Sequence, residues 1–426
     1  MASEQTLVEN SGPPSAFSSS IGFDQDNFNA YVTNTYGRFP IAIEKGEGCT
    51  VTDTQGKEYL DFVAGIATCT LGHAHPALIE TITQQIQKLH HVSNFYYIPS
   101  QGELARWIVN NSCADKVFFC NSGAEANEAA IKLARLYGHQ VLEIDEPVIL
   151  TAKASFHGRT LATITATGQP KYHKGFEPLV RGFEYVPYND LIAIEDAIGD
   201  IDEGSYRRVA AIMLEPLQGE GGIRPGDLDY FLRLRKICDE TGILLILDEV
   251  QVGMGRTGKL WGYENLGIEP DIFTAAKGLA GGIPIGAMMN KKFCDLFQPG
   301  NHASTFGGNP LSTAAGLCVA RVLEQDNLLN NVIARGEQLR TRLRAIAASH
   351  PDLFVEVRGW GLINGMELNP DVEISSIDIV KAALDEGLLI APAGPKVLRF
   401  VPPLIVSEAE IDRGISMLEK AIANAR

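Results

Sequence analysis

The sequence predicts an α/β protein whose mostly parallel sheet is covered by helices on both faces. The chain has 426 residues, 45% of them hydrophobic and 21% charged, so it can bury a large core in two or three lobes. Short apolar runs bounded by turn residues alternate along it with stretches of helical periodicity. This alternation is typical of strand–helix–strand units, which build parallel sheets.

The expected strands are apolar runs of four to seven residues, short enough for buried strands and too short for most helices. They are Lys116–Cys120, Val148–Thr151, Val209–Glu215, Ile243–Asp248, Ile272–Ala275 and Ile285–Met289. Apolar residues spaced by three and four predict helices over Ala124–Leu136 and over Asp227–Glu240, the second ending at Thr241-Gly242.

The last third of the chain has a different pattern of predicted helices and strands. Two charged helical stretches surround two short strands, and all four lie beyond the last strand of the parallel series. These elements are Leu329–Ala348, Glu356–Val357, Ser376–Glu386 and Leu398–Phe400. The change predicts a domain boundary between about residues 310 and 330.

Charge and cysteine content narrow the function classes. A net charge of −16 and a pI near 5.1 argue against binding to nucleic-acid phosphates or to anionic membranes. Seven cysteines without a C-x-x-C pair fit neither a disulfide framework nor a zinc site and suit a reducing compartment. No apolar run approaches the ~20 residues of a membrane span, and the polar first 30 residues lack a signal core, so a cytoplasmic protein is expected.

Two kinds of feature imitate ligand-binding motifs. Gly253–Lys259 nearly completes a phosphate-binding loop, but residue 260 is leucine where that loop needs a hydroxyl for magnesium. The histidines His73, His75, His90 and His91 lack partners at metal-ligand spacing, so we expect them to cap or pack and expect no metal site.

Three further features together point to a phosphorylated cofactor. Small and hydroxyl residues at Asn121–Asn127 begin a helix, whose N-terminus either binds an anion or is simply capped. Asp248 and Lys277 follow two strands of equal polarity, at the sheet edge where ligands bind. An anion cup, a carboxylate and a lysine fit pyridoxal phosphate, with the lysine forming the Schiff base and the acid pairing with the pyridinium nitrogen.

Seven motifs follow one another along the chain: FVAGIATCTLGHAHP, FFCNSGAEANEAAIKLAR, SFHGRTLATITATGQPKY, LEPLQGEGG, LLILDEVQVGMGRTG, AAKGLAGGIPIGAM and STFGGNP. Together they resemble the class III pyridoxal-phosphate aminotransferases, and the likeness runs from about Tyr36 to the last helix. The resemblance implies fold type I of these transferases, with a seven-stranded large domain and a smaller α+β domain. We expect a flexible tail over residues 1–30, a segment joining the small domain over 31–75, the large domain over 76–315 and the small domain over 316–426.

The resemblance also implies roles for individual residues. Lys277 would be the Schiff-base lysine and Asp248 the partner of the pyridinium nitrogen. The remaining cofactor contacts would be the phosphate cup Ser122, Gly123 and Ala124, the ring sandwich Phe156 and Val250, and a hydrogen bond from Gln251 to the phenolic oxygen. Thr305 would reach the phosphate of a neighbouring subunit, which implies a homodimer with shared active sites.

Substrate binding would depend on two arginines. Arg159 would hold the distal carboxylate of either substrate, and Arg399 the α-carboxylate of glutamate. Glu215 matches a switching glutamate that pairs with Arg399 when no carboxylate is present, the alternative being a permanent Glu–Arg salt bridge. The implied reaction moves the terminal amino group of N2-acetylornithine to 2-oxoglutarate, in the context of arginine biosynthesis.

The acyl pocket is the least specified part. Ile66, where ornithine-specific relatives carry an aromatic residue, would leave room for an acyl tail, and Tyr36 and Val92–Phe95 are further candidates. Alternative substrates are succinylornithine, ornithine and 4-aminobutyrate. The same fold hosts an aminomutase, and a non-catalytic nucleotide-binding or scaffold protein built on Gly253–Lys259 is the alternative from another class.

Overall fold

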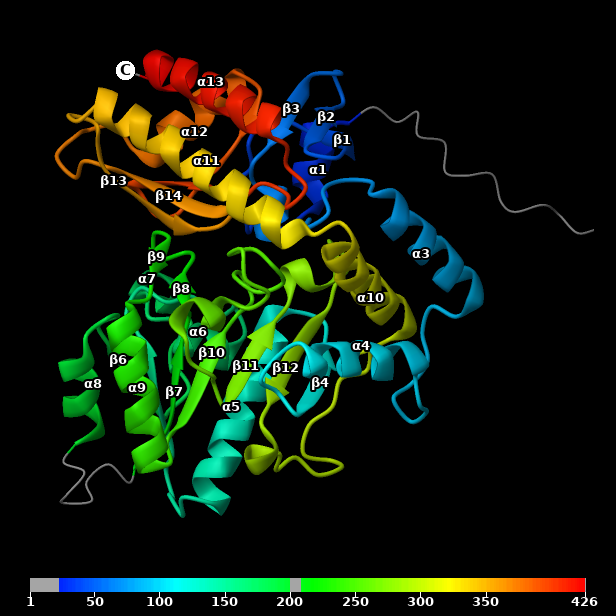
Figure 1. Cartoon of the computed structure of the whole chain (residues 1–426), viewed down its shortest axis with the longest axis vertical. Coiled ribbons are helices and arrows are strands. Elements are labelled where there is room, and N and C mark those ends of the chain that lie inside the picture. The colour runs from blue at the N-terminus through cyan, green and yellow to red at the C-terminus, as the bar shows by residue number, and fades with distance from the viewer. Residues whose placement is uncertain (1–22, 200–207, 426) are drawn as a thin grey trace, which may run out of the picture.

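The centre of the protein is a seven-stranded sheet in the order β4-β12-β11-β10-β7-β5-β6, seen in a computed structural model that describes residues 23–199 and 208–425 (Figure 1). The strands are β4 (Lys116–Cys120), β5 (Val148–Ala152), β6 (Phe183–Val186), β7 (Val209–Leu214), β10 (Leu244–Asp248), β11 (Ile272–Ala275) and β12 (Gly286–Asn290). Only β12 runs against the others. The predicted mostly parallel sheet and its six predicted strands are confirmed.

Both faces of this sheet are covered, which is why its central strands are apolar throughout. Leu244 and Ile246 of β10 pack with α5 (Gly123–Gln140) in one core cluster. Leu245 and Leu247 point the other way, into a second cluster with α9 (Leu228–Thr241). In this sheet, the strand that the sequence did not predict is β6, a half-buried edge strand.

Smaller elements complete this part of the chain. The helices are α6 (Leu161–Ala166), α7 (Pro170–His173) and α8 (Leu191–Ile198), with the 3₁₀ turns η2 (Gly262–Leu266), η3 (Lys277–Ala280) and η4 (Lys292–Cys294). β8 (Leu217–Gln218) and β9 (Arg224–Pro225) form a small hairpin above the carboxyl ends of the parallel strands.

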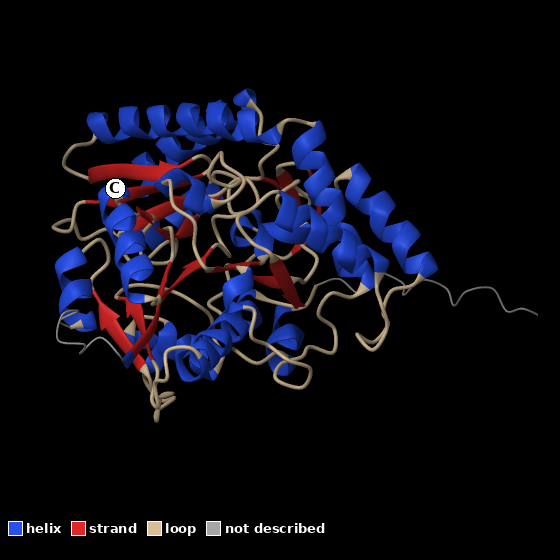
Figure 2. Ribbon diagram, turned by 60° about the horizontal axis from the view of Figure 1, so that its bottom comes forward, coloured by secondary structure: helices blue, strands red, loops and turns tan. Residues whose placement is uncertain are grey.

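A second, antiparallel sheet comes from the last third of the chain. It has the order β13-β14-β17-β16, formed by β13 (Phe354–Trp360), β14 (Ile363–Leu368), β17 (Val397–Phe400) and β16 (Ala391–Pro392). The helices with it are α11 (Leu328–Ser349), α12 (Ser376–Asp385) and α13 (Glu408–Ala425), and Figure 2 shows helices outside the strands.

A third sheet joins the two ends of the chain. β1 (Ile43–Glu47), β2 (Thr50–Asp53) and β3 (Glu58–Asp61) are antiparallel neighbours, and β15 (Leu388–Leu389) pairs with β3 in parallel. Lys57 adds a hydrogen bond from its Nζ to the carbonyl oxygen of Asp385, at 2.9 Å. The early segment is therefore tied to the chain's end, while the division into domains stays a prediction.

The remaining helices come from the first 110 residues of the chain, except α10, which lies at the predicted domain boundary. Much of the predicted tail falls outside the described residues, but its last part forms α1 (Gln25–Tyr31), because Asp24 caps the N–H groups of Asp26 and Asn27. The others are α2 (Ala64–Ala67), α3 (Pro76–Lys88), α4 (Pro99–Asn110) and α10 (Pro310–Gln325). α10 packs on α3 and α4 and crosses the predicted boundary at residue 316.

Within the described residues, the features that imitate ligand-binding motifs make structural contacts. Arg256 of Gly253–Lys259 is buried and donates to the carbonyl oxygen of Leu362 at 3.1 Å, which fixes the segment to the second sheet. His73 Nε2 lies 2.7 Å from a carboxylate oxygen of Asp61. No described helix is long and apolar enough to cross a bilayer.

Candidate active site

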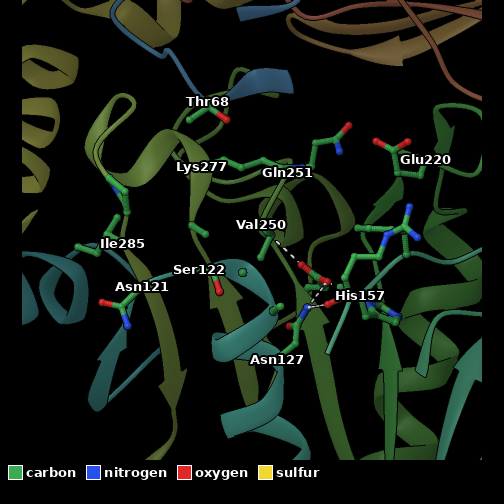
Figure 3. Close-up of a pocket in the computed structure, with 18 of the residues that line it drawn as sticks. Thr68, Asn121, Ser122, Asn127, His157, Glu220, Val250, Gln251, Lys277 and Ile285 are labelled. Carbon is green, nitrogen blue, oxygen red and sulfur yellow. Dashed lines mark hydrogen bonds and ion pairs between the residues drawn. The ribbon is translucent and has the colours of Figure 1, made fainter. Parts of the chain in front are cut away.

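A cavity of about 440 Å³ opens at the carboxyl ends of the parallel strands, where ligands bind in open α/β sheets (Figure 3). It brings together most of the site residues expected from the sequence. Those that line it are Ser122, Gly123, Ala124, Phe156, Arg159, Glu215, Asp248, Val250, Gln251 and Lys277. They come from segments spread over more than 150 residues, so the fold gathers what the sequence had only suggested.

One end of the cavity is the N-terminus of α5. Ser122 caps the helix, its hydroxyl accepting from the backbone N–H of Glu125 at 3.2 Å. The first N–H groups of a helix have no partner within it, so those of Gly123 and Ala124 remain available for an anion. Gly123 is also a steric requirement, because a Cβ there would lie 2.7 Å from Cγ1 of Val250.

Asp248 ends β10 inside a network that fixes its carboxylate. One carboxylate oxygen accepts from Asn127 Nδ2 at 2.7 Å and lies 2.8 Å from His157 Nδ1. The other accepts from the backbone N–H of Val250 at 3.0 Å. Asn127 is itself held by Thr274, whose hydroxyl donates to it at 2.7 Å. A buried carboxylate held by this many donors has one orientation, as a fixed partner for a cationic group requires.

Lys277 follows β11 and points its amine into the cavity (Figure 3). Its backbone has φ +40°, a left-handed conformation that costs a non-glycine residue about 1 kcal/mol or more. The turn is held by Thr70, whose hydroxyl donates to the carbonyl oxygen of Gly278 at 3.0 Å. Burial lowers the pKa of the Lys277 ammonium, and the nearby Arg399 lowers it further while Glu220 opposes the shift. A lysine with a lowered pKa is the better nucleophile at neutral pH.

The carboxylate that faces Arg399 is Glu220, and the predicted pair with Glu215 is wrong. Arg399 forms a buried ion pair with Glu220 and donates to Gln251 Oε1 at 3.3 Å. Burial alone would raise the pKa of Glu220, but the charges of Arg399 and Lys277 outweigh it and hold that pKa below its ordinary value.

Glu215 points away from Arg399 because two backbone donors occupy its carboxylate. It accepts from the N–H of Phe156 at 3.0 Å and from the N–H of Gly219 at 3.1 Å. Burial, reinforced by the neighbouring charge of Asp248, raises the pKa of Glu215 to about 7. Glu215 therefore joins two loops of the cavity wall.

Of the other expected residues, one lies at the rim of the cavity and three lie outside its lining. Arg159 lies at the rim with its guanidinium over the rings of Phe156 and Tyr172. Tyr36 and Thr305 are exposed and, with Ile66, lie outside the residues that line the cavity.

Comparison with known protein families decides to which one the chain belongs. The family model for aminotransferase class-III matches residues 31–422. The chain belongs to the class-III aminotransferases. It is 70% identical over 421 residues to an acetylornithine aminotransferase of Nostoc sp., covering 98% of each chain. It is also 70% identical over 402 residues to one of Synechocystis sp., covering 94% of each.

Solved structures of aminotransferases share the fold. The ornithine aminotransferase of Toxoplasma gondii is 33% identical with a TM-score of 0.89, covering 94% of each chain. The N-acetylornithine aminotransferase of Stenotrophomonas maltophilia is 38% identical with a TM-score of 0.79, covering 94% of this chain and 98% of that one. The fold predicted from the resemblance is confirmed.

Three residues of this aminotransferase site were missed by the sequence reasoning. Asn127 carried a usable signal, because it is a polar residue on the otherwise apolar face of the predicted helix. His157 lies between two singled-out residues, Phe156 and Arg159, but nothing local shows that it meets Asp248. Glu220 stands in the same motif as Glu215, and only the path of the chain after β7 distinguishes the two.

Proposed function

We propose that this class-III aminotransferase uses pyridoxal 5′-phosphate to move the terminal amino group of N2-acetylornithine to 2-oxoglutarate. The observation that carries the proposal is the composition of one cavity, where Lys277 and Asp248 share space with the N-terminus of α5. The acetylornithine assignment is supported by the 70% identity to acetylornithine aminotransferases over nearly the whole chain.

The residues present fit the proposed cofactor. The glycine at 123 keeps a cradle open at the anion-binding helix end, where Ser122, Gly123 and Ala124 would hold the phosphate. Asp248 would hold the ring nitrogen, and Lys277 would hold the aldehyde carbon. When bound, this cofactor acts as an electron sink for the carbon that carries the amine.

The ring itself would lie between Val250 and Phe156, which both line the cavity. Gln251 would donate to the phenolic oxygen from its amide nitrogen, since its Oε1 already accepts from Arg399. The amine of Lys277 would move the proton between substrate and cofactor, because it is the basic group that points into the cavity beside them.

Two arginines account for the use of two different substrates at one site. N2-acetylornithine carries its carboxylate far from the reacting amine, as does glutamate with its side-chain carboxylate, and Arg159 would bind both. Glutamate also has a carboxylate next to the reacting carbon, which Arg399 would bind once Glu220 moves away. With acetylornithine, Glu220 stays and neutralises the buried Arg399.

The acyl group would lie toward the early segment of the chain. The backbone of Ala64–Ala67 has positive φ at every residue, from +48° to +64°, and leads into Thr68 of the cavity wall. Ile66 belongs to this turn, and its aliphatic side chain would leave room for the acetyl group. Tyr36 would line the same acyl pocket.

A second copy of the chain would complete the site. Phe95, Tyr96, Tyr97 and Phe306 are all at least 61% exposed, an unusual concentration of aromatic surface for an isolated monomer. Thr305 lies beside Phe306 and would reach the neighbouring subunit's phosphate from there. We therefore propose a homodimer with shared active sites, working in the cytoplasm.

A donor panel tests the function. Purified protein incubated with pyridoxal phosphate should turn yellow, and borohydride should fix the cofactor on the peptide that contains Lys277. With 2-oxoglutarate as acceptor, kcat/KM should be higher for N2-acetylornithine than for succinylornithine, ornithine or 4-aminobutyrate. A preference for free ornithine would overturn the acetylornithine assignment, and protein unable to take up the cofactor would overturn the aminotransferase proposal.

A further inference from the structure

The guanidinium of Arg159 is held in an unusual way for a substrate-binding arginine. Within the described residues, no hydrogen bond or ion pair fixes it. It lies 4.1 Å from the ring centroid of Tyr172 and 5.5 Å from that of Phe156. Its guanidinium carbon lies over both rings, and its N–H groups make no hydrogen bond in the part of the chain that the structure describes.

The ring of Tyr172 is in turn fixed from two sides. It makes an edge-on contact with Phe156, with the ring centroids 5.9 Å apart and the planes at 80°. Its helix, α7, begins at Pro170 and is attached to the cavity wall through Gln169. The amide nitrogen of Gln169 donates to the carbonyl oxygens of Ala154 and Ser155, at 3.3 and 3.0 Å.

The residues before α7 bring it close to the main sheet. Gly168 forms a bridge with Lys153, and a Cβ at Gly168 would lie only 2.1 Å from the carbonyl oxygen of Ala152. His173, the last residue of α7, lies with its Nε2 2.7 Å from the carbonyl oxygen of Thr167. The stretch TGQPKY is thus a turn anchored close to the main sheet, and it carries the Tyr172 ring.

We propose that Tyr172 is a positioning residue that presents Arg159 to the distal carboxylate of both substrates. The inference rests on the proposed function, in which Arg159 binds that carboxylate. An arginine held by aromatic rings keeps its N–H groups available for a bidentate carboxylate pair, whereas one held by an acidic side chain would have to give up that partner first. Lys171 lies over the same ring, 4.7 Å from its centroid, and adds positive charge near Arg159.

The inference predicts an effect limited to substrates with the distal carboxylate. Tyr172→Leu removes the ring and keeps apolar bulk, and Tyr172→Phe keeps the ring. We expect Tyr172→Leu to raise KM for N2-acetylornithine and for 2-oxoglutarate about fivefold with little change in kcat, since cation–π contacts are modest in energy. Tyr172→Phe should restore the wild-type KM.

N-acetylputrescine is the matched probe, because it is N2-acetylornithine without the carboxylate. Its half-reaction should be equally slow in the wild type and in Tyr172→Leu. A second readout avoids turnover altogether. N-acetylnorvaline keeps the carboxylate and lacks the amine, and its Kd by titration calorimetry should rise about fivefold in Tyr172→Leu.

Controls separate the possible failures. Phe176→Leu removes another exposed aromatic ring just beyond α7 and should behave as the wild type. If Arg159→Ala leaves KM for N2-acetylornithine unchanged, the proposed function has assigned the wrong arginine. If Arg159→Ala weakens binding but Tyr172→Leu does not, or if Tyr172→Leu weakens both acetylated amines equally, the positioning role is refuted. In the Arg159→Ala background, Tyr172→Leu should have no further effect.

Discussion

Replacing Glu220 by glutamine separates the two halves of the reaction. The substitution keeps the size of the side chain and removes the charge that faces Arg399. While N2-acetylornithine reacts, no substrate carboxylate neutralises that arginine, so the variant has an unpaired buried guanidinium at this stage. While glutamate reacts, its own carboxylate takes that place. We therefore expect Glu220→Gln to impair the acetylornithine half-reaction selectively.

The structure sets the size of the effect. Removing one partner of a fully buried ion pair costs about 3–5 kcal/mol. Here the Arg399 side chain is 4% exposed but that of Glu220 is 25% exposed, and Gln251 and the carbonyl oxygen of Pro392 remain as acceptors at 3.3 and 3.4 Å. Because the free enzyme loses the pair as well, the effect appears as a difference between the substrates: kcat/KM for N2-acetylornithine should fall relative to that for glutamate by about 2 kcal/mol, roughly thirtyfold.

Single-turnover kinetics on each half-reaction would measure this loss. The absorption change of the bound cofactor is followed after mixing with N2-acetylornithine or with glutamate, in the wild type, Glu220→Gln and Glu215→Gln. Glu215→Gln should slow both half-reactions to a similar degree, because Glu215 supports the loops of Phe156 and Gly219. Selective loss in Glu215→Gln, or equal losses in Glu220→Gln, would refute the assignment of the switching carboxylate.

Three further predictions concern stability. Gly168→Ala should lower the free energy of unfolding by about 2–3 kcal/mol in urea denaturation, since its Cβ has only 2.1 Å to the backbone oxygen of Ala152; an unchanged midpoint would contradict the packing described. Asn127→Leu should lower it by about 2 kcal/mol and weaken cofactor affinity, measured by fluorescence titration, because Asp248 loses a buried donor; wild-type affinity would argue against the network. Burial raises the pKa of Glu249 from 4.5 to about 8, so the folded state holds a proton that the unfolded chain releases, and this contribution to stability is lost as pH rises toward 8. Urea denaturation between pH 5 and 8 should show a flatter pH dependence for Glu249→Gln than for the wild type, and parallel curves would contradict the shift.

Much of the fold could be read from the sequence, because local signals and burial agreed. The apolar run Lys116–Cys120 and the helical periodicity of Ala124–Leu136 placed a strand and a helix where the structure has them. The antiparallel direction of β12 carried no such signal, since a buried strand is apolar whichever way it runs. β6 was missed because it is an edge strand with half-buried residues and no apolar run.

The residues of the candidate site also fall into those that the sequence could predict and those that it could not. Asp248 and Lys277 end apolar strands, so their place at one sheet edge followed from strand polarity alone. Choosing between Glu215 and Glu220 required the path of the chain after β7, which brings Glu220 to Arg399, 179 residues further on. Motif order in the chain does not encode which of two nearby side chains faces a distant partner.

The pairing of β3 with β15 has a consequence for synthesis of the chain. Lys57 and the residue whose carbonyl it meets are 328 positions apart, so a ribosome has translated most of the chain before β3 gains its parallel neighbour. Until then the early sheet has an open edge, and open edges invite pairing with other chains. Thr70 and the Gly278 carbonyl oxygen to which it donates are 208 positions apart, so the turn of Lys277 can gain that contact well before β15 is made. A nascent chain would therefore keep an unpaired strand edge until Leu388 and Leu389 of β15 emerge, and this places the demand for chaperones late in translation.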